Sequence, residues 1–130
     1  MISYGVDESG RFLTISYSGH VGLREFENLV ETVRNGIGRL RRDVIFLGDL
    51  THLESMDPAC ATGLGTIMEL LDEHGVALIL RVIPDPAKDI GFNLISQFHL
   101  RGNVRIHTVP NLAEALKILL DEAPALTGAA

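Results

Sequence analysis

Apolar and polar residues alternate along the first part of the chain, in a segment from Ile2 to Asp7 and again from Arg11 to Tyr17. Such alternation is typical of strands with one buried face. In the second segment that face collects Leu13, Ile15 and Tyr17. The polar residues Glu8-Ser9-Gly10 separate the two segments, so the pattern predicts a β-hairpin. A second turn is expected after it, at Ser18-Gly19-His20.

Four later segments carry apolar residues at the three-and-four spacing of an amphipathic helix. Their inner stripes are Leu23, Phe26, Leu29, Val30, Val33 and Ile37, then Leu64, Ile67, Met68 and Leu71, then Ile90, Leu94, Ile95 and Phe98, then Leu112, Ala115, Leu116 and Leu119. Asn35, Gly36 and Gly38 are expected to end the first helix, and Gly75 and Gly102 follow the second and third stripes. Pro110 precedes the fourth, which we expect to fray from Pro124 onward.

Apolar segments between these helices predict three further strands, at Val44–Leu47, Val76–Ile83 and Val104–His107. The first two are apolar enough to be buried on both faces, and the third is shorter and weaker. Strands that are joined through helices must run parallel. The sequence therefore predicts a single α/β domain with a mixed β-sheet of about five strands and four helices. Binding sites in such folds form at the carboxyl ends of the strands, which here include Asp49 to Thr62.

The composition narrows the class of protein. A chain of 130 residues with 46% hydrophobic residues forms one domain with its own core, which we place at residues 1–122, with a frayed tail at 123–130. The formal charge of −6 repels phosphate backbones, so nucleic acid is not an expected partner. No apolar stretch approaches the roughly 20 residues of a membrane span, and the N-terminus lacks a secretion pattern. Together with the single cysteine, Cys60, these features indicate a soluble cytoplasmic protein.

The usual catalytic and cofactor signatures fail on this sequence. The five histidines lie far apart and no second cysteine completes a metal site. Gly63-Leu64-Gly65 begins like a dinucleotide loop, but Met68 stands where the third glycine is needed. Nothing in the sequence brings a histidine to Cys60, and a small helix cysteine is more often buried packing than a nucleophile. We therefore expect no enzyme, no cofactor and no metal.

Three short motifs carry a resemblance to a known family: Val44-Ile45-Phe46-Leu47-Gly48-Asp49-Leu50-Thr51, Ser55-Met56-Asp57 and Thr62-Gly63-Leu64-Gly65. They resemble the STAS domain, the fold of bacterial anti-sigma-factor antagonists. Asp49 and Asp57 match both aspartates of the family pattern at the family's separation. The strand before Pro84, the segment Leu100-Arg101-Gly102 and the closing helix are also similar, so the resemblance covers residues 1 to about 122.

The resemblance implies a function in protein recognition. In that family, the helix that Ser-Gly-Leu-Gly opens binds a partner kinase that also acts as an anti-sigma factor, and phosphorylation of the serine blocks binding. This chain is then expected to be a non-catalytic regulatory module that recognises such a partner through the loop and helix 57–71. A homodimer is also compatible with the resemblance. The partner-binding residues that it implies are Asp49, Asp57, Cys60, Gly63, Leu64 and Gly65.

The chain departs from the family pattern in one place. Five residues, Pro58-Ala59-Cys60-Ala61-Thr62, separate Asp57 from Gly63, where the family has two. Counted back from Gly63, the phosphoacceptor is Thr62. Counted forward from Asp57, it is Ala59, which has no hydroxyl. Ser55 is a second hydroxyl candidate in the same segment.

Two placements of the helix start are open. In one, Asp57 is the N-cap and Pro58 the first helical residue, and in the other Thr62 is the N-cap and the extra residues form a loop. Capping also offers an ordinary role for Asp57. Gly63 and Gly65 each cost about 1 kcal/mol near a helix start, which predicts close packing or exposed backbone there. The alternative function is a STAS-like module without phosphorylation that binds a small apolar or nucleotide ligand or scaffolds an assembly.

Overall fold

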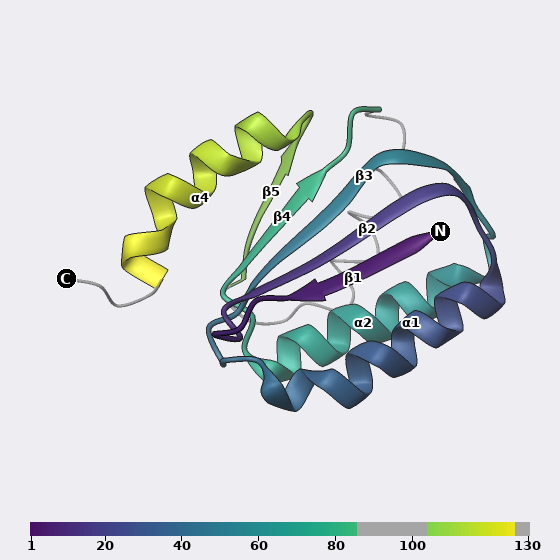
Figure 1. Cartoon of the computed structure of the whole chain (residues 1–130), viewed down its shortest axis with the longest axis horizontal. Coiled ribbons are helices and arrows are strands. Elements are labelled where there is room, and N and C mark those ends of the chain that lie inside the picture. The colour runs from purple at the N-terminus through teal and green to yellow at the C-terminus, as the bar shows by residue number, and fades with distance from the viewer. Residues whose placement is uncertain (86–103, 127–130) are drawn as a thin grey trace.

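The computed structural model describes residues 1–85 and 104–126, and its described strands form one mixed five-stranded sheet in the order β1-β2-β3-β4-β5 (Figure 1). The first two strands form the predicted antiparallel hairpin, and each later strand runs parallel to its neighbour. The strands are β1 (Ile2–Val6), β2 (Phe12–Val21), β3 (Ile45–Met56), β4 (Leu78–Val82) and β5 (Arg105–Val109). The predicted α/β class and mixed sheet are confirmed.

The described residues hold three α-helices and one short 3-10 helix: α1 (Leu23–Gly36), η1 (Ile37–Arg39), α2 (Cys60–His74) and α4 (Leu112–Leu126). The helix that the sequence predicts over Ile90 to Phe98 lies outside the described residues. The last helix continues to Leu126, past the position near 122 where we expected the domain to end. None of the described helices is long and apolar enough to cross a membrane.

The helices cover the two faces of the sheet unequally. The β2-α1-β3 and β3-α2-β4 connections step in the same direction across the sheet, and α1 and α2 lie on one face while α4 lies on the other (Figure 1). Strand alternation then divides the core: Phe46 packs with the α1 and α2 residues, whereas Ile45 packs with Ala115 of α4. An ion pair also joins α4 to β5: Glu122 Oε1 lies 2.9 Å from Arg105 Nη2.

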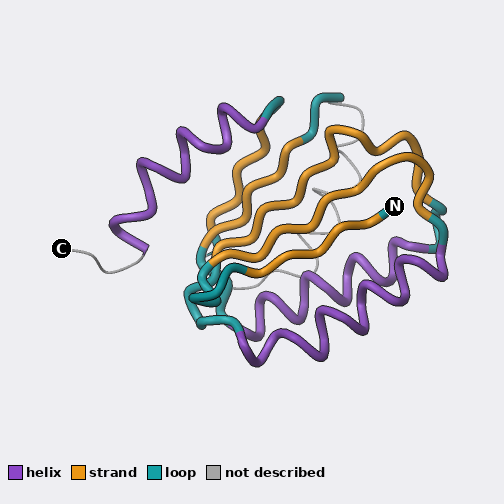
Figure 2. The backbone as a smooth tube through the Cα atoms, in the orientation of Figure 1, coloured by secondary structure: helices purple, strands orange, loops and turns teal. Residues whose placement is uncertain are grey.

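Two central strands are longer than the sequence predicts. The turn expected at Ser18-Gly19-His20 is wrong, because these residues lie inside β2, where bulges shift the register and Gly19 adopts a φ of +65°. Likewise β3 does not end at Leu47 but pairs with β2 as far as Met56, which lies opposite Val21. The pairing partner extends both strands, and local turn residues are accommodated as bulges. Figure 2 shows the two strands curving together toward the ends where α1 and α2 begin.

Candidate functional site

A tight turn at Asp57 connects β3 to α2. The Asp57 amide donates to the Val21 carbonyl of β2 at 2.9 Å, which ties the turn to the sheet. The Asp57 Oδ1 atom accepts a hydrogen bond from the Ala59 amide at 2.9 Å, and its carbonyl accepts one from Cys60 at 2.9 Å. Asp57 thus satisfies amide groups that the helix start leaves without partners. Asp57 therefore supports the helix start through its side chain, although it does not occupy the N-cap position that the sequence predicted for it.

Neither predicted placement of the helix start is observed, because α2 begins at Cys60 and not at Pro58 or Gly63. The placement with Thr62 as N-cap is wrong, because α2 begins at Cys60 and Thr62 is its third residue. The residue at the N-cap position is Ala59, which offers no side-chain cap, and the Asp57 carboxylate performs that role from two residues earlier. The extra residues therefore lengthen the helix start instead of forming a loop.

Both candidate phosphoacceptors are exposed, on different elements. Thr62 lies in the first turns of α2, and its carbonyl accepts a hydrogen bond from Thr66 Oγ1 at 3.2 Å. Ser55 lies near the end of β3, where its Oγ is 2.7 Å from Nδ1 of His20 on β2. Ser55 therefore already has a side-chain partner across the strand pair.

Asp49 is not brought to Asp57. It lies in the middle of β3, opposite Ser16 of β2 and Val82 of β4, and its Oδ1 accepts a hydrogen bond from the Thr51 amide at 3.0 Å. Its neighbour Leu50 belongs to the core on the α1 and α2 side, so alternation directs Asp49 to the opposite face. Asp49 therefore lies on the sheet face away from α1 and α2, whereas Asp57 lies in the turn before α2.

The remaining candidates on α2 divide into buried and surface positions. Leu64 and Gly65 are buried on the inner side of the helix, where they hold it against the core. Gly63 is half-buried and faces α1: a Cβ atom placed on it would lie 2.8 Å from two ring carbons of Phe26. The close packing that the sequence predicts for Gly63 is therefore between two helices.

A groove of about 320 Å³ runs between α1 and the start of α2. Its α1 wall is formed by Leu23, Phe26, Glu27, Val30 and Glu31. Its α2 wall is formed by Ala59, Cys60, Thr62 and Gly63. Three of the predicted site residues, Cys60, Thr62 and Gly63, therefore line one groove. The α1 residues that form its other wall were not among the predicted site residues.

Cys60 is fully buried beneath this groove. Burial raises the pKa of its thiol, and the carboxylates of Asp57 and Glu27 raise it further. The thiol is therefore neutral at ordinary pH, unlike a reactive cysteine, whose pKa is lowered by its surroundings. In the described residues, no group of three or more histidine, cysteine or acidic side chains is placed to hold a metal ion.

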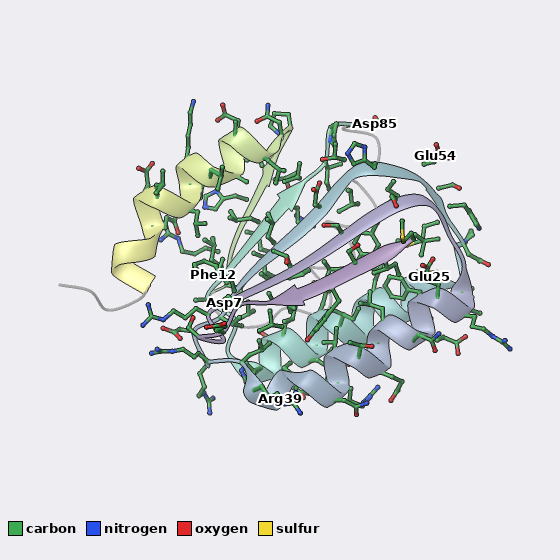
Figure 3. The ribbon with its side chains drawn as sticks, viewed as in Figure 1. Asp7, Phe12, Glu25, Arg39, Glu54 and Asp85 are labelled. Carbon is green, nitrogen blue, oxygen red and sulfur yellow. The ribbon has the colours of Figure 1, made fainter. Side chains whose placement is uncertain are left out.

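Glu27 and Glu31 are the residues that sequence reasoning missed. They are exposed and lie four positions apart, so they fall on the same face of α1. In Figure 3, Glu25, Glu54 and Asp85 lie toward the end of the sheet where α1 begins, and Asp7 and Arg39 lie toward the opposite end. A search of the sequence for acidic residues four positions apart would have found Glu27 and Glu31. It would not have shown that they line a groove together with the start of α2.

No family model and no curated protein matches the chain by sequence. Solved structures do match. The anti-sigma factor antagonist SpoIIAA in its unphosphorylated form aligns with a TM-score of 0.67 at 12% identity, over 92% of this chain and 98% of its own. A Shewanella loihica protein of the DUF3478 family, described as having a SpoIIAA-like fold, aligns with a TM-score of 0.67 at 12% identity, over 91% and 93%.

An anti-sigma factor antagonist from Mycobacterium paratuberculosis aligns with a TM-score of 0.58 at 16% identity, over 93% of this chain and 96% of its own. These alignments span nearly the whole of each protein, so the likeness concerns the complete domain. At such low identity it is a likeness of fold. The chain therefore has a SpoIIAA-like fold, which agrees with the fold that its sequence motifs predicted.

Proposed function

We propose that this protein is a non-catalytic regulatory module that binds a protein partner, an anti-sigma factor or serine-kinase-like protein, through the loop and helix 57–71. The observation that carries the proposal is the start of α2, where exposed residues stand on a rigid support in a fold shared with anti-sigma factor antagonists. The exposed residues there are Pro58, Ala59, Ala61 and Thr62.

The support consists of the helix's own inner face and the Asp57 turn. Leu64, Ile67 and Leu71 are buried in the core, and the turn is bonded to β2 through Val21. A surface that is ordered before binding loses less conformational entropy when a partner docks. The start of α2 is thus suited to recognition of another protein.

Phosphorylation of Thr62, or of Ser55, is part of the proposal. A phosphate adds about −1.5 to −2 charge, which the N-terminal end of a helix tolerates. Thr62 is exposed and near that end, so its modification would change the charge of the surface while α2 stays folded. Of the two hydroxyls, Thr62 lines the α1–α2 groove and Ser55 does not.

A second candidate is a STAS-like module that does not switch by phosphorylation and binds a small apolar or nucleotide ligand or scaffolds an assembly. The residue at the N-cap of α2 favours it, because Ala59 has no hydroxyl to modify. Native mass spectrometry of the freshly purified protein tests the ligand version. A bound species of fixed mass would support it, and an unliganded spectrum would count against it.

The experiment for the first candidate measures binding to each purified anti-sigma factor and serine-kinase-like protein of the same genome by isothermal titration calorimetry. We expect one of them to bind, and Ala61→Arg on the exposed side of α2 to weaken that binding at least tenfold. Leu116→Glu on α4, at the opposite face, is the control and should leave it unchanged. Incubation with the partner and ATP, followed by intact mass measurement, then shows whether Thr62 or Ser55 gains a phosphate. No binding to any of these proteins would contradict the proposal.

A further inference from the structure

The α1–α2 groove combines an apolar interior with an acidic rim. Phe26, Val30 and Cys60 are buried at its base, and Leu23 at its end keeps 39% of its surface exposed. Leu23 extends the apolar surface of the groove to its exposed end. The groove is therefore shaped to accept an apolar side chain.

The rim determines which kind of apolar segment fits. Glu27 and Glu31 project from α1 at the rim of the groove. The Asp57 carboxylate lies near the other wall. The carboxylates of Asp57 and Glu27 are both close enough to the Cys60 thiol beneath the groove to raise its pKa. All residues that line the groove belong to the described part of the chain, and none of them is lysine or arginine. Glu31 shares an exposed ion pair with Arg34 at 3.5 Å, which water screens. The groove thus has an acidic rim around an apolar centre.

We propose that the α1–α2 groove binds a segment of the protein partner in which an apolar side chain is flanked by lysine or arginine residues. The inference rests on the proposed function, since the segment belongs to that same partner. Charge complementarity at a rim steers encounter and excludes acidic competitors, while the apolar anchor supplies most of the affinity. When a segment binds in a groove as a helix, it presents such apolar anchors at three- or four-residue spacing.

A peptide selection tests the chemistry without the natural partner. A library of random 12-residue peptides displayed on phage is selected on the wild-type protein, after peptides that bind the selection support alone have been removed. We expect the enriched peptides to contain leucine, isoleucine or phenylalanine with at least two lysine or arginine residues nearby. Enrichment of peptides without excess positive charge, or no enrichment at all, would overturn the inference.

Matched variants then locate the binding surface for one synthetic enriched peptide. Ala59 and Ala61 are both exposed near the start of α2, but only Ala59 lines the groove. Ala59→Arg should weaken peptide binding at least tenfold, and Ala61→Arg should leave it within twofold. Equal effects of the two substitutions would place the peptide elsewhere and overturn the inference.

The acidic rim is tested in the same way. The double variant Glu27→Gln/Glu31→Gln should weaken binding about three- to tenfold and flatten its dependence on salt. The control Glu8→Gln/Glu73→Gln removes the same charge from exposed positions outside the groove and should have no effect. An identical response of both double variants would show that net charge alone attracts the peptide, which would also overturn the inference.

The natural partner separates this inference from the function on which it rests. If a natural partner binds and Ala61→Arg weakens that binding but Ala59→Arg does not, the proposed function is supported and the groove is not the site where the partner binds. If no partner binds but the selected peptides respond to Ala59→Arg as expected, the groove binds such segments and the proposed function fails.

Discussion

Gly63 of α2 lies against the ring of Phe26 in α1 so closely that a Cβ atom on the glycine would approach two ring carbons to 2.8 Å. The ring has little freedom to yield, because Phe26 is 1% exposed and stacks on Tyr17 with a centroid separation of 6.3 Å. The absence of a side chain at position 63 therefore sets how closely α1 and α2 approach.

We predict that Gly63→Ala destabilises the protein, although alanine is the better helix former. The gain in helix propensity is about 1 kcal/mol, whereas overpacking in a close-packed core costs about 1–3 kcal/mol. Urea unfolding should show a net loss of up to about 2 kcal/mol. Gly38→Ala, where nothing lies within 4 Å of the added atom, is the control and should not destabilise. A Gly63→Ala protein more stable than wild type would show that the helices are not in contact there.

Replacement of Asp57 by alanine removes the acceptor for the Ala59 amide, which is 2.9 Å from Oδ1. Loss of a helix cap costs about 0.5–2 kcal/mol, so we expect Asp57→Ala to lower the free energy of unfolding by that amount in urea denaturation. Asp57→Asn keeps an oxygen at the same place and should retain most of the stability. Equal losses for the two variants would mean that the carboxylate's charge, and not its hydrogen bond, stabilises the turn.

Stability should fall in acid partly through Asp7 in the hairpin turn. The Ser9 hydroxyl, together with the amides of Phe12 and Arg11, holds the pKa of the Asp7 carboxyl below its usual value. A carboxyl with a lowered pKa in the folded state contributes stability above its unfolded value near 3.9, and this is lost as pH falls through the folded pKa.

We therefore expect the difference in unfolding free energy between wild type and Asp7→Asn to shrink as the pH is lowered below about 4, measured by urea titrations from pH 6 to pH 2. The neighbouring Glu8→Gln is a matched control in the same turn. A wild-type and Asp7→Asn difference that is constant over the whole range would rule out this contribution.

Cys60 should react slowly with alkylating reagents. Burial raises the pKa of its thiol, and Asp57 and Glu27 add to the effect, so the thiolate forms at higher pH in the folded protein than in the unfolded chain. At pH 8, iodoacetamide should modify the native protein at least tenfold more slowly than the protein in urea, as followed by intact mass.

The Glu27→Gln variant separates charge from burial in this reaction. It should increase the native alkylation rate, because one of the carboxylates that disfavour the thiolate has been removed. Glu31→Gln on the same helix face is the control, because the carboxylates that raise the pKa of the thiol are those of Asp57 and Glu27. A native rate equal to that of the unfolded protein would show that Cys60 is accessible.

Local patterns determined most of the elements. Alternation at Leu13, Ile15 and Tyr17 correctly placed the buried face of β2, since successive strand residues point to opposite sides whatever the partner. The stop at Gly75 was also readable, because its φ of +95° is a conformation that glycine adopts without strain. These features depend on residues close in sequence, so the sequence alone contains the information.

Tertiary structure decided where β3 ends and α2 begins. The bond from Asp57 to Val21, and the contact of His20 with Ser55 across 35 positions, extend the strands past residues that read locally as turns. The role of Gly63 likewise depends on where Phe26 of α1 comes to lie. Such outcomes follow from hydrogen bonds and packing between distant segments, which hydrophobic periodicity does not encode. The sequence thus determined the elements and their faces, and tertiary contacts determined the groove and the surface beside it.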